Sequence, residues 1–470
     1  MKLAMTWREI NLKVLSCALM LRWFFRGVLG LIALLVVLLV VLVLSAVAPL
    51  QRYQVHQQPF YQQANAQLDS ISNLHPKPAR HAFQTGYARV SITPAYRTST
   101  AGYGNRGRQL FSTIHDSLYV RTVVVDNGTE KVALMAIDLL LMPPAVRERV
   151  EENIAALGFE PRQLFYAGTH THNGVGNWGH GAIGFLYGSF DEKLVQFLAD
   201  QILGSIRQAD RQKQPSRILH GRQSVPGIVE NRMLNDTTSV DRLLRMMVIE
   251  QQTGDRLALA SFTAHPTCLS STVLELSRDY PGLLVDQLEK SGYQFAMFLA
   301  GGVASHAPRS PRHNWDKMSD LAMALAQSAS TITLQPVLDS TLAAIRFPLP
   351  MADPQLKLSR DWRLRPWVFH AAFGRQPVYL SAVRMGNLVW LGTPCDFSGQ
   401  LVQQLDSIHV QHPLMVTSFN GGYTGYITPD EFYDVDHYET RLMNWYGPGN
   451  GTYFVHCLNR LTTAVLRDPR

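Results

Sequence analysis

Two histidines that alternate with threonines are the first residues of this sequence that could do chemistry. His170 and His172 follow an apolar, strand-like stretch at 165–168 and precede the glycine-containing stretch 173–176. In an extended backbone two such imidazoles point to the same side, and the following glycines let the chain turn tightly around a ligand. The pattern favours a metal site, although paired histidines at a strand edge are also common as ordinary polar residues.

Three later segments offer further candidates. His265 ends an apolar strand and is followed by proline, while Asp396 follows Cys395 at the end of a valine-containing strand. Tyr426 and Tyr438 lie in an aromatic-rich stretch near the C-terminus. Taken singly, these residues also fit a core histidine, a helix N-cap and surface packing, respectively.

The elements that must position these residues alternate between strands and helices. The spacing of apolar residues predicts strands at 86–94, 120–125, 131–142, 163–167, 257–262, 295–299, 378–385 and 388–391. It predicts helices at 146–157, 191–206, 281–291 and 316–328. We therefore expect an α/β fold with mixed β-sheets flanked by helices, forming a single large catalytic domain preceded by one transmembrane helix.

The N-terminal segment has the composition of a membrane anchor. Residues 27–50 contain no charged side chain and are long enough to cross the roughly 30 Å hydrocarbon core, whereas residues 1–26 are basic. By the positive-inside rule we expect a single-pass membrane protein with residues 1–26 in the cytoplasm and the catalytic domain on the extracytoplasmic side, which is periplasmic, lumenal or extracellular. A cleaved signal peptide with a site at 46–48 is the alternative, but its apolar region would be unusually long. Residues 51–84 are expected to form a stalk or a surface helix, and 85–470 the catalytic domain.

The charge distribution argues against a nucleic-acid partner. The formal net charge is +7, and most of it lies in the first 26 residues. The remainder of the chain has no basic run, so no nucleic-acid partner is expected and no protein partner is inferred. The four cysteines show no close-pair metal spacing.

Together, these blocks resemble the neutral (alkaline, non-lysosomal) ceramidase family from about residue 85 onward. In the histidine block the family's serine is replaced by Asn173. The matching blocks are 86–94, 101–103, 115–126, 169–174, 231–232 and 265–267.

The resemblance implies one zinc ion per chain. The family binds it through two histidines, a glutamate and a tyrosine, which correspond here to His170, His265, Asp396 and Tyr426. The carboxylate is one methylene shorter than in the family. The local turn must therefore move inward, or Cys395 must act as a thiolate ligand instead.

The resemblance also implies three residues that act on the substrate. His172 would transfer a proton to the leaving amine, and Tyr438 would donate a hydrogen bond to the developing oxyanion. Ser305 corresponds to a substrate-contacting serine, but the Asp and Pro of the family's Gly-Asp-x-Ser-Pro-Asn loop are missing here. An ordinary turn serine is therefore an equal alternative.

The implied activity is zinc-dependent hydrolysis of the amide bond of an N-acyl lipid. Ceramide would give a fatty acid and a sphingoid base, which would place the protein in sphingolipid metabolism. The alternatives are a zinc amidase or esterase for another acyl substrate and a membrane-tethered lipid-binding protein that has lost catalysis. A metallo-β-lactamase fold fits poorly, because Gly174 and Val175 stand where it needs Asp and His. The family carries a further immunoglobulin-like domain, which we do not expect in a sequence that ends at Arg470.

Overall fold

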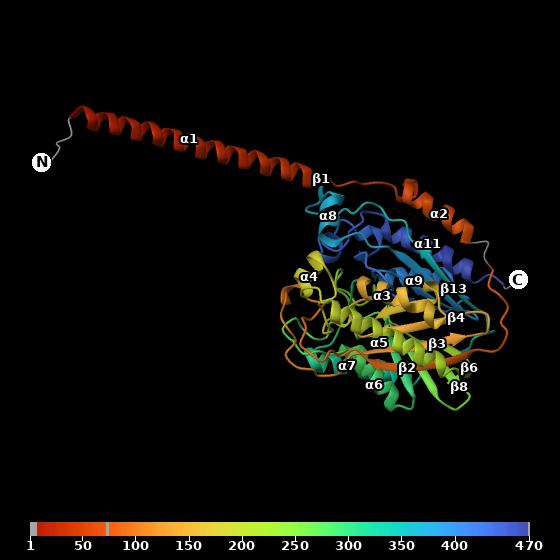
Figure 1. Ribbon diagram of the computed structural model, residues 1–470. Helices are drawn as coiled ribbons and strands as arrows, with labels where there is room; N and C mark the ends of the chain where they lie inside the picture. The colour runs from red at the N-terminus through yellow and green to blue at the C-terminus, as the bar shows by residue number, and fades with distance from the viewer. Residues whose placement is uncertain (1–6, 72–74, 469–470) are drawn as a thin grey trace.

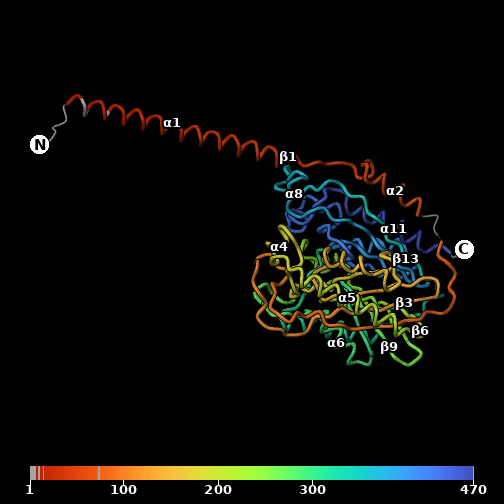
Figure 2. Tube along the Cα trace, viewed as in Figure 1, coloured from red at the N-terminus to blue at the C-terminus, as the bar shows by residue number. Residues whose placement is uncertain are grey.

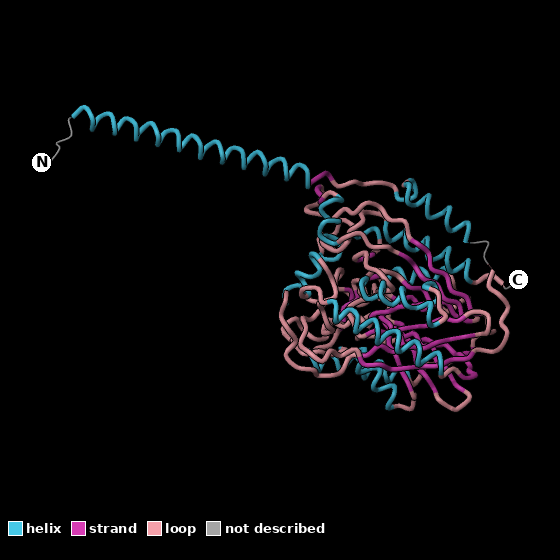
Figure 3. Tube along the Cα trace, in the orientation of Figure 1, coloured by secondary structure: helices cyan, strands magenta, loops and turns pink. Residues whose placement is uncertain are grey.

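The computed structural model describes residues 7–71 and 75–468. Two β-sheets stack face to face in the centre, and helices cover the outer face of each sheet (Figure 1). Strands therefore occupy the interior and helices the periphery (Figure 3). This arrangement confirms the predicted fold of mixed sheets flanked by helices.

The larger sheet is mixed parallel and antiparallel. Its strands are β2 (Gln84–Ser91), β3 (Tyr119–Asp126), β4 (Lys131–Ile137), β5 (Leu164–Gly168), β6 (Gln214–Ser224), β8 (Leu243–Gln251), β9 (Arg256–Phe262), β10 (Phe295–Ala300) and β12 (Gln335–Pro336). They run in the order β10-β9-β8-β6-β2-β3-β4-β5, and β12 pairs with β6. β4 and β5 pair in parallel, as do β9 and β10. β5 ends two residues before His170, and β9 ends three residues before His265.

The smaller sheet comes from the C-terminal half. Its strands are β13 (Leu342–Pro348), β15 (Tyr379–Met385), β16 (Leu388–Gly392) and β18 (Leu414–Thr417), in the order β13-β15-β16-β18. Short two-stranded pairs join β1 (Val47–Pro49) with β14 (Trp362–Leu364), β7 (Val229–Asn231) with β11 (His306–Pro308), and β17 (Asp396–Phe397) with β19 (Tyr426–Ile427).

Helices cover the outer face of each sheet, and one further helix projects from the domain (Figure 1). The main helices are α1 (Trp7–Ala46), α2 (Pro59–Ile71), α3 (Pro144–Asn153), α4 (Gly181–Tyr187), α5 (Glu192–Arg211), α6 (Asp279–Lys290), α7 (Asn314–Ala329), α8 (Pro366–Phe373), α9 (Gly399–Ile408), α10 (Tyr438–Arg441) and α11 (Asn450–Val465). α5, with apolar residues at helical spacing, buries Leu194, Leu198 and Ile202 on the larger sheet. α11 buries Leu458 and Leu461 on the smaller sheet.

The core between the two sheets explains why many central strands are apolar on both faces. Val124 and Met135 of the larger sheet face the helices, whereas Val123 and Leu134 pack with Trp390 of the smaller sheet. A strand covered on both sides has no solvent-facing positions and therefore reads as a continuous apolar run. This is the pattern at 132–137 of β4.

The element boundaries differ from the prediction where the chain turns toward the candidate site. The predicted strand 131–142 ends at Ile137, because the next residues leave the ladder and the Leu140 carbonyl contacts His170. The segment 51–84 contains α2, a surface helix whose Ala64 and Leu68 pack in the core beside α11. Of the two expected structures, the surface helix is therefore present over 59–71.

The N-terminal helix projects away from the folded domain (Figure 2). α1 is long and apolar enough to cross a membrane, and its apolar stretch buries nothing against the rest of the described chain. The helix ends at Ala46, because residues 47–49 form β1 and pair with β14. The predicted apolar segment 27–50 thus contains the end of the helix and a short strand.

Candidate metal centre

The paired histidines lie in the loop that follows β5. His170 adopts a left-handed backbone conformation with φ of 63°, and its amide donates to the Leu139 carbonyl at 3.1 Å. This conformation is uncommon for a residue other than glycine and turns the chain sharply after the strand. Gly102 lies against the loop, where a Cβ atom would be 2.6 Å from the His172 Cα, so only glycine fits there.

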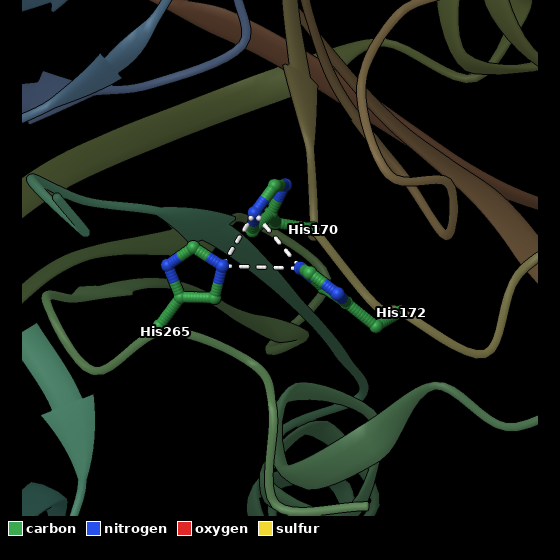
Figure 4. A group of neighbouring side chains, drawn as sticks. All are labelled: His170, His172 and His265. Carbon is green, nitrogen blue, oxygen red and sulfur yellow. Dashed lines mark hydrogen bonds between the residues drawn. The ribbon is translucent and has the colours of Figure 1, made fainter. Parts of the chain in front are cut away.

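Three imidazoles meet at one point (Figure 4). The Nε2 atom of His170 lies 2.9 Å from that of His265 and 3.2 Å from that of His172, and the last two are 3.0 Å apart. All three side chains are buried. The structure therefore brings His170 and His265 together as predicted, and adds His172 to the same cluster.

The hydrogen bonds behind the rings determine which nitrogen carries the proton. His170 Nδ1 lies 2.6 Å from the Leu140 carbonyl and His265 Nδ1 lies 3.4 Å from the Val303 carbonyl, so each Nδ1 is the donor. Their Nε2 lone pairs then face each other at 2.9 Å. Such a contact is repulsive unless a cation lies within reach of both nitrogens, so the donor set fits a metal ion.

Burial keeps the three imidazoles neutral. Loss of solvation lowers the pKa of His170 to about 3 and holds the pKa values of His172 and His265 well below the ordinary value. Neutral imidazole is the metal-binding form of histidine.

A carboxylate completes one side of the cluster. Asp396 is buried, and its Oδ1 lies 3.5 Å from His170 Nε2 without a hydrogen-bond partner among the described residues. Its Oδ2 accepts a hydrogen bond from the Tyr423 hydroxyl at 2.6 Å. Burial raises the pKa of Asp396 to about 7, and a nearby cation would favour its ionised form.

The adjacent cysteine lies in a different environment. Cys395 packs in the apolar core with Leu391 and Phe397, and burial raises the pKa of its thiol well above the ordinary value. The histidine cluster that could hold a metal does not include it. The geometry therefore favours Asp396 over Cys395 as the carboxylate-side ligand.

The two tyrosines lie beside the cluster. Tyr426 pairs with Asp396 in the β17–β19 ladder, and its ring stacks on His265 at a centroid distance of 6.3 Å. Tyr438 packs edge-on against Tyr426 at 5.9 Å and is half exposed. Arg232 donates to the Tyr426 hydroxyl at 3.2 Å.

Ser305 is part of a buried ionic network. Its hydroxyl donates to Glu439 Oε2 at 2.5 Å, and Arg232 donates to Glu439 Oε1 at the same distance. Both Ser305 and Glu439 are fully buried. Ser305 is thus linked to Tyr426 through Glu439 and Arg232, and its predicted contact with substrate stays a prediction.

An apolar cavity of about 460 Å³ opens onto the cluster. His170, His172, Asp396, Tyr426 and Tyr438 contribute to its polar end. Leucine, isoleucine and aromatic side chains line the rest, among them Leu140, Trp178, Ile183, Phe369, Phe373 and Trp445. The arrangement places a candidate metal site at the polar end of a cavity suited to hydrocarbon.

Two further residues, outside the predicted site, support the histidine loop. Buried Arg106 donates to the His172 carbonyl at 2.7 Å and to the Val273 carbonyl at 2.7 Å, which ties the histidine loop to the segment after His265. Asn173 donates to the carbonyls of Val273 and Glu275, a pair of bonds that a serine could not make. Asn173 is visible in the sequence as the replacement for the family's serine, whereas Arg106 lies in no pattern that singles it out.

Comparison with known proteins tests the resemblance of this chain to a known family. Residues 83–307 match the family described as neutral/alkaline non-lysosomal ceramidase, N-terminal. The resemblance to the neutral ceramidase family is confirmed. The neutral ceramidase of Pseudomonas aeruginosa is 24% identical over 254 residues, which cover 49% of this chain and 38% of that relative.

Two solved structures have a similar fold. The crystal structure of neutral ceramidase from Pseudomonas aeruginosa superposes with a TM-score of 0.70 at 18% identity, covering 85% of this chain and 76% of the other. A structure described as ceramidase complexed with C2 also gives 0.70, at 17% identity, covering 83% of this chain and 76% of the other. These likenesses establish a ceramidase-like fold beyond residue 307.

Proposed function

We propose that this protein is a zinc-dependent hydrolase that cleaves the amide bond of an N-acyl lipid such as ceramide. The observation that carries the proposal is the set of three convergent imidazoles at an apolar cavity, beside an Asp396 oxygen that has no hydrogen-bond partner in the described part of the chain. The proteins that this chain resembles are named as ceramidases, which supports the same substrate class.

His170, His265 and Asp396 would hold one metal ion, with Tyr426 beside them. Histidine nitrogens and a carboxylate are ordinary zinc ligands. His172 is a third candidate nitrogen ligand, because its Nε2 faces the other two. When bound, zinc would polarise the amide carbonyl and lower the pKa of a coordinated water.

The chain's own residues bind and orient the substrate. The apolar wall of the cavity would take up an acyl chain and exclude water from the site. Tyr438 lies at the polar end, where its hydroxyl would donate a hydrogen bond to the oxygen that gains charge. Where His172 does not hold the metal, its imidazole lines the cavity and would pass a proton toward the leaving amine.

A substrate panel with the purified full-length protein tests the proposal. N-acylsphingosine, N-acyl amino acids and acyl esters are supplied in detergent, and released fatty acid is measured before chelation, after chelation and after zinc is restored. We expect N-acylsphingosine to be hydrolysed, the activity to disappear with a chelator, and zinc to restore it. A preference for another acyl compound would reassign the substrate class while keeping the metal chemistry.

A lipid-binding protein without catalysis is the second candidate. It is favoured by the shorter carboxylate at Asp396 and by the engagement of Ser305 with Glu439 instead of the cavity. This candidate predicts stoichiometric binding of N-acylsphingosine and no fatty acid release at any metal concentration.

A further inference from the structure

The anchor helix ends where the folded domain begins. Residues 27–46 of α1 are uncharged, and at about 1.5 Å per residue they span about 30 Å, the thickness of the hydrocarbon core. Arg26 stands at one end of this stretch, and β1 begins directly after the other. If α1 spans a bilayer, the membrane surface therefore falls at β1.

Hydrogen bonds connect the end of α1 and β1 to β14 and the start of α8. We call this group of contacts the clasp. β1 pairs antiparallel with β14, and the Arg365 amide donates to the Ala46 carbonyl at 2.8 Å. Trp367 Nε1 donates to the Ser45 carbonyl at 2.8 Å. These bonds join the last turn of α1 to the first turn of α8, so α8 is held beside the membrane surface instead of hanging on a flexible linker.

α8 separates the cavity from the outside. Phe369 and Phe373 line the cavity, whereas Trp367 is 50% exposed and does not line it. α8 is therefore apolar on the cavity side and on its outer side. A short helix that exposes a tryptophan beside an apolar anchor has the composition of a membrane interface.

α4, like α8, lies between the cavity and the outside. Ile183 and Leu186 line the cavity, while Phe185 is 70% exposed. Gly181 starts the helix so close to α8 that a Cβ atom would lie 2.8 Å from the Ala372 carbonyl oxygen. Figure 1 shows α8 and α4 on the side of the domain from which α1 leaves.

Charged side chains around the clasp favour a lipid surface over an apolar protein partner. Arg360, Arg365 and Arg375 are exposed in the segment that includes β14 and α8, together with Asp361. Arginines that flank exposed aromatic residues are typical of contacts with anionic lipid headgroups.

We propose that the outer faces of α4 and α8 form a membrane-docking lip, clasped to the anchor by β1 and β14, through which the cavity takes its ligand directly from the bilayer. The ligand part of this inference rests on the proposed function, whereas the docking part does not. The occupant of the surface is the membrane that α1 spans.

Site-directed spin labelling of the full-length protein tests the docking. Cys17 is exposed and the other three cysteines are buried, so Cys17→Ser gives a background for a single label. Labels are introduced by Phe185→Cys and, as a matched control, by Leu338→Cys, since Leu338 is 79% exposed and lies before β13. The protein is reconstituted in phosphatidylcholine–phosphatidylglycerol vesicles.

We expect the label at position 185 to collide with oxygen dissolved in the bilayer and to be protected from a water-soluble nickel chelate. The label at 338 should be accessible to the chelate. Equal accessibility to the chelate at both positions would overturn the proposal.

A kinetic comparison tests the entry of ligand. Phe185→Ser should raise the KM for N-acylsphingosine in vesicles by up to about tenfold, since one aromatic side chain is lost from the lipid contact, and leave kcat unchanged. Leu338→Ser should change neither constant. In detergent micelles, both variants should match the natural protein. An unchanged KM of Phe185→Ser in vesicles would contradict direct entry of the ligand from the bilayer. Absence of hydrolysis in both vesicles and micelles would contradict the proposed function, but it would not affect the labelling result.

Discussion

The two sides of the candidate metal centre are built differently. The histidine side comes from loops at the ends of β5 and β9 in the larger sheet, and the Nδ1 atoms of His170 and His265 face backbone carbonyls. The opposite side comes from Asp396 and Tyr426, which lie side by side in the two-residue strands β17 and β19. The first side lies within the residues that match the family, and the second lies beyond them.

This difference shows where the site can vary. The imidazoles are fixed by the larger sheet, so their positions follow from the fold. The carboxylate depends on a short local pairing, which brings Asp396 Oδ1 to 3.5 Å from His170 Nε2 although its side chain is shorter than glutamate. A chain with this architecture can adjust the carboxylate side while the histidine side stays constant.

The largest effect is expected on the histidine side. His265→Ala should remove the bound metal and reduce hydrolysis to background, because the cluster loses a candidate ligand. Hydrogen bonds from the His265 amide to the His306 carbonyl and from its Nδ1 to the Val303 carbonyl hold this ligand in place. Metal content and fatty acid release are measured together. His220→Ala, a change in β6 outside the cluster, is the control and should keep both.

The next effect tests the carboxylate side. Asp396→Asn should lower the turnover by at least about 100-fold, because the site loses the negative charge that balances the metal. Asp396→Glu should also be harmful, since Asp396 Oδ1 already lies 3.5 Å from His170 Nε2 and another methylene would overfill the site. Cys395→Ser should be tolerated in turnover, because its sulfur lies in the apolar core.

If Cys395→Ser instead removed the metal while Asp396→Asn kept it, the assignment of the two residues would be reversed. Full activity in all three variants would show that this segment does not contact the metal. Zinc content and kcat for each variant separate these outcomes.

A smaller effect on the metal site is expected from a residue that only orients a candidate metal ligand. Tyr423→Phe removes the hydrogen bond to Asp396 Oδ2 and should lower the metal affinity by about 10-fold, a typical cost of losing a residue that orients a ligand. Competition with a zinc-binding dye measures the affinity. A change confined to kcat, with unaltered zinc affinity, would argue that Tyr423 contacts the substrate instead.

Deletion of residues 1–46 should have the smallest effect on the chemistry. α1 lies outside the cavity, so hydrolysis of detergent-dispersed substrate should be unchanged. If α1 is the membrane anchor, the shortened protein should leave the membrane pellet after a salt wash. β1 is kept because it pairs with β14. Loss of activity in detergent, with the fold intact by circular dichroism, would show that α1 contributes to the site.

The sequence predicted the parts of the molecule that have a local signal. The apolar runs of the central strands and the His-Thr-His spacing are visible within a few residues, and the fold and the meeting of His170 with His265 agree with them. The pairing of β17 with β19 has no such signal, because each strand is two residues long and the partners are distant in sequence. The same holds for the β1–β14 clasp and for Arg106, most of whose partners are backbone carbonyls.

His172 shows the limit most clearly. The sequence predicts that it lies on the same side as His170, and the family resemblance assigns it a proton-transfer role. In the structure its Nε2 lies 3.0 Å from His265 Nε2, a position suited to a third ligand. Backbone curvature after β5, which includes the left-handed His170, decides this position and cannot be read from residue spacing.

Metal analysis of the purified full-length protein tests the central claim most directly. Elemental analysis is carried out on the natural protein, on His170→Ala and on His220→Ala after identical chelator-free purification. We expect one zinc per chain in the natural protein and in His220→Ala, and none in His170→Ala. Equal zinc content in His170→Ala and the natural protein would contradict it.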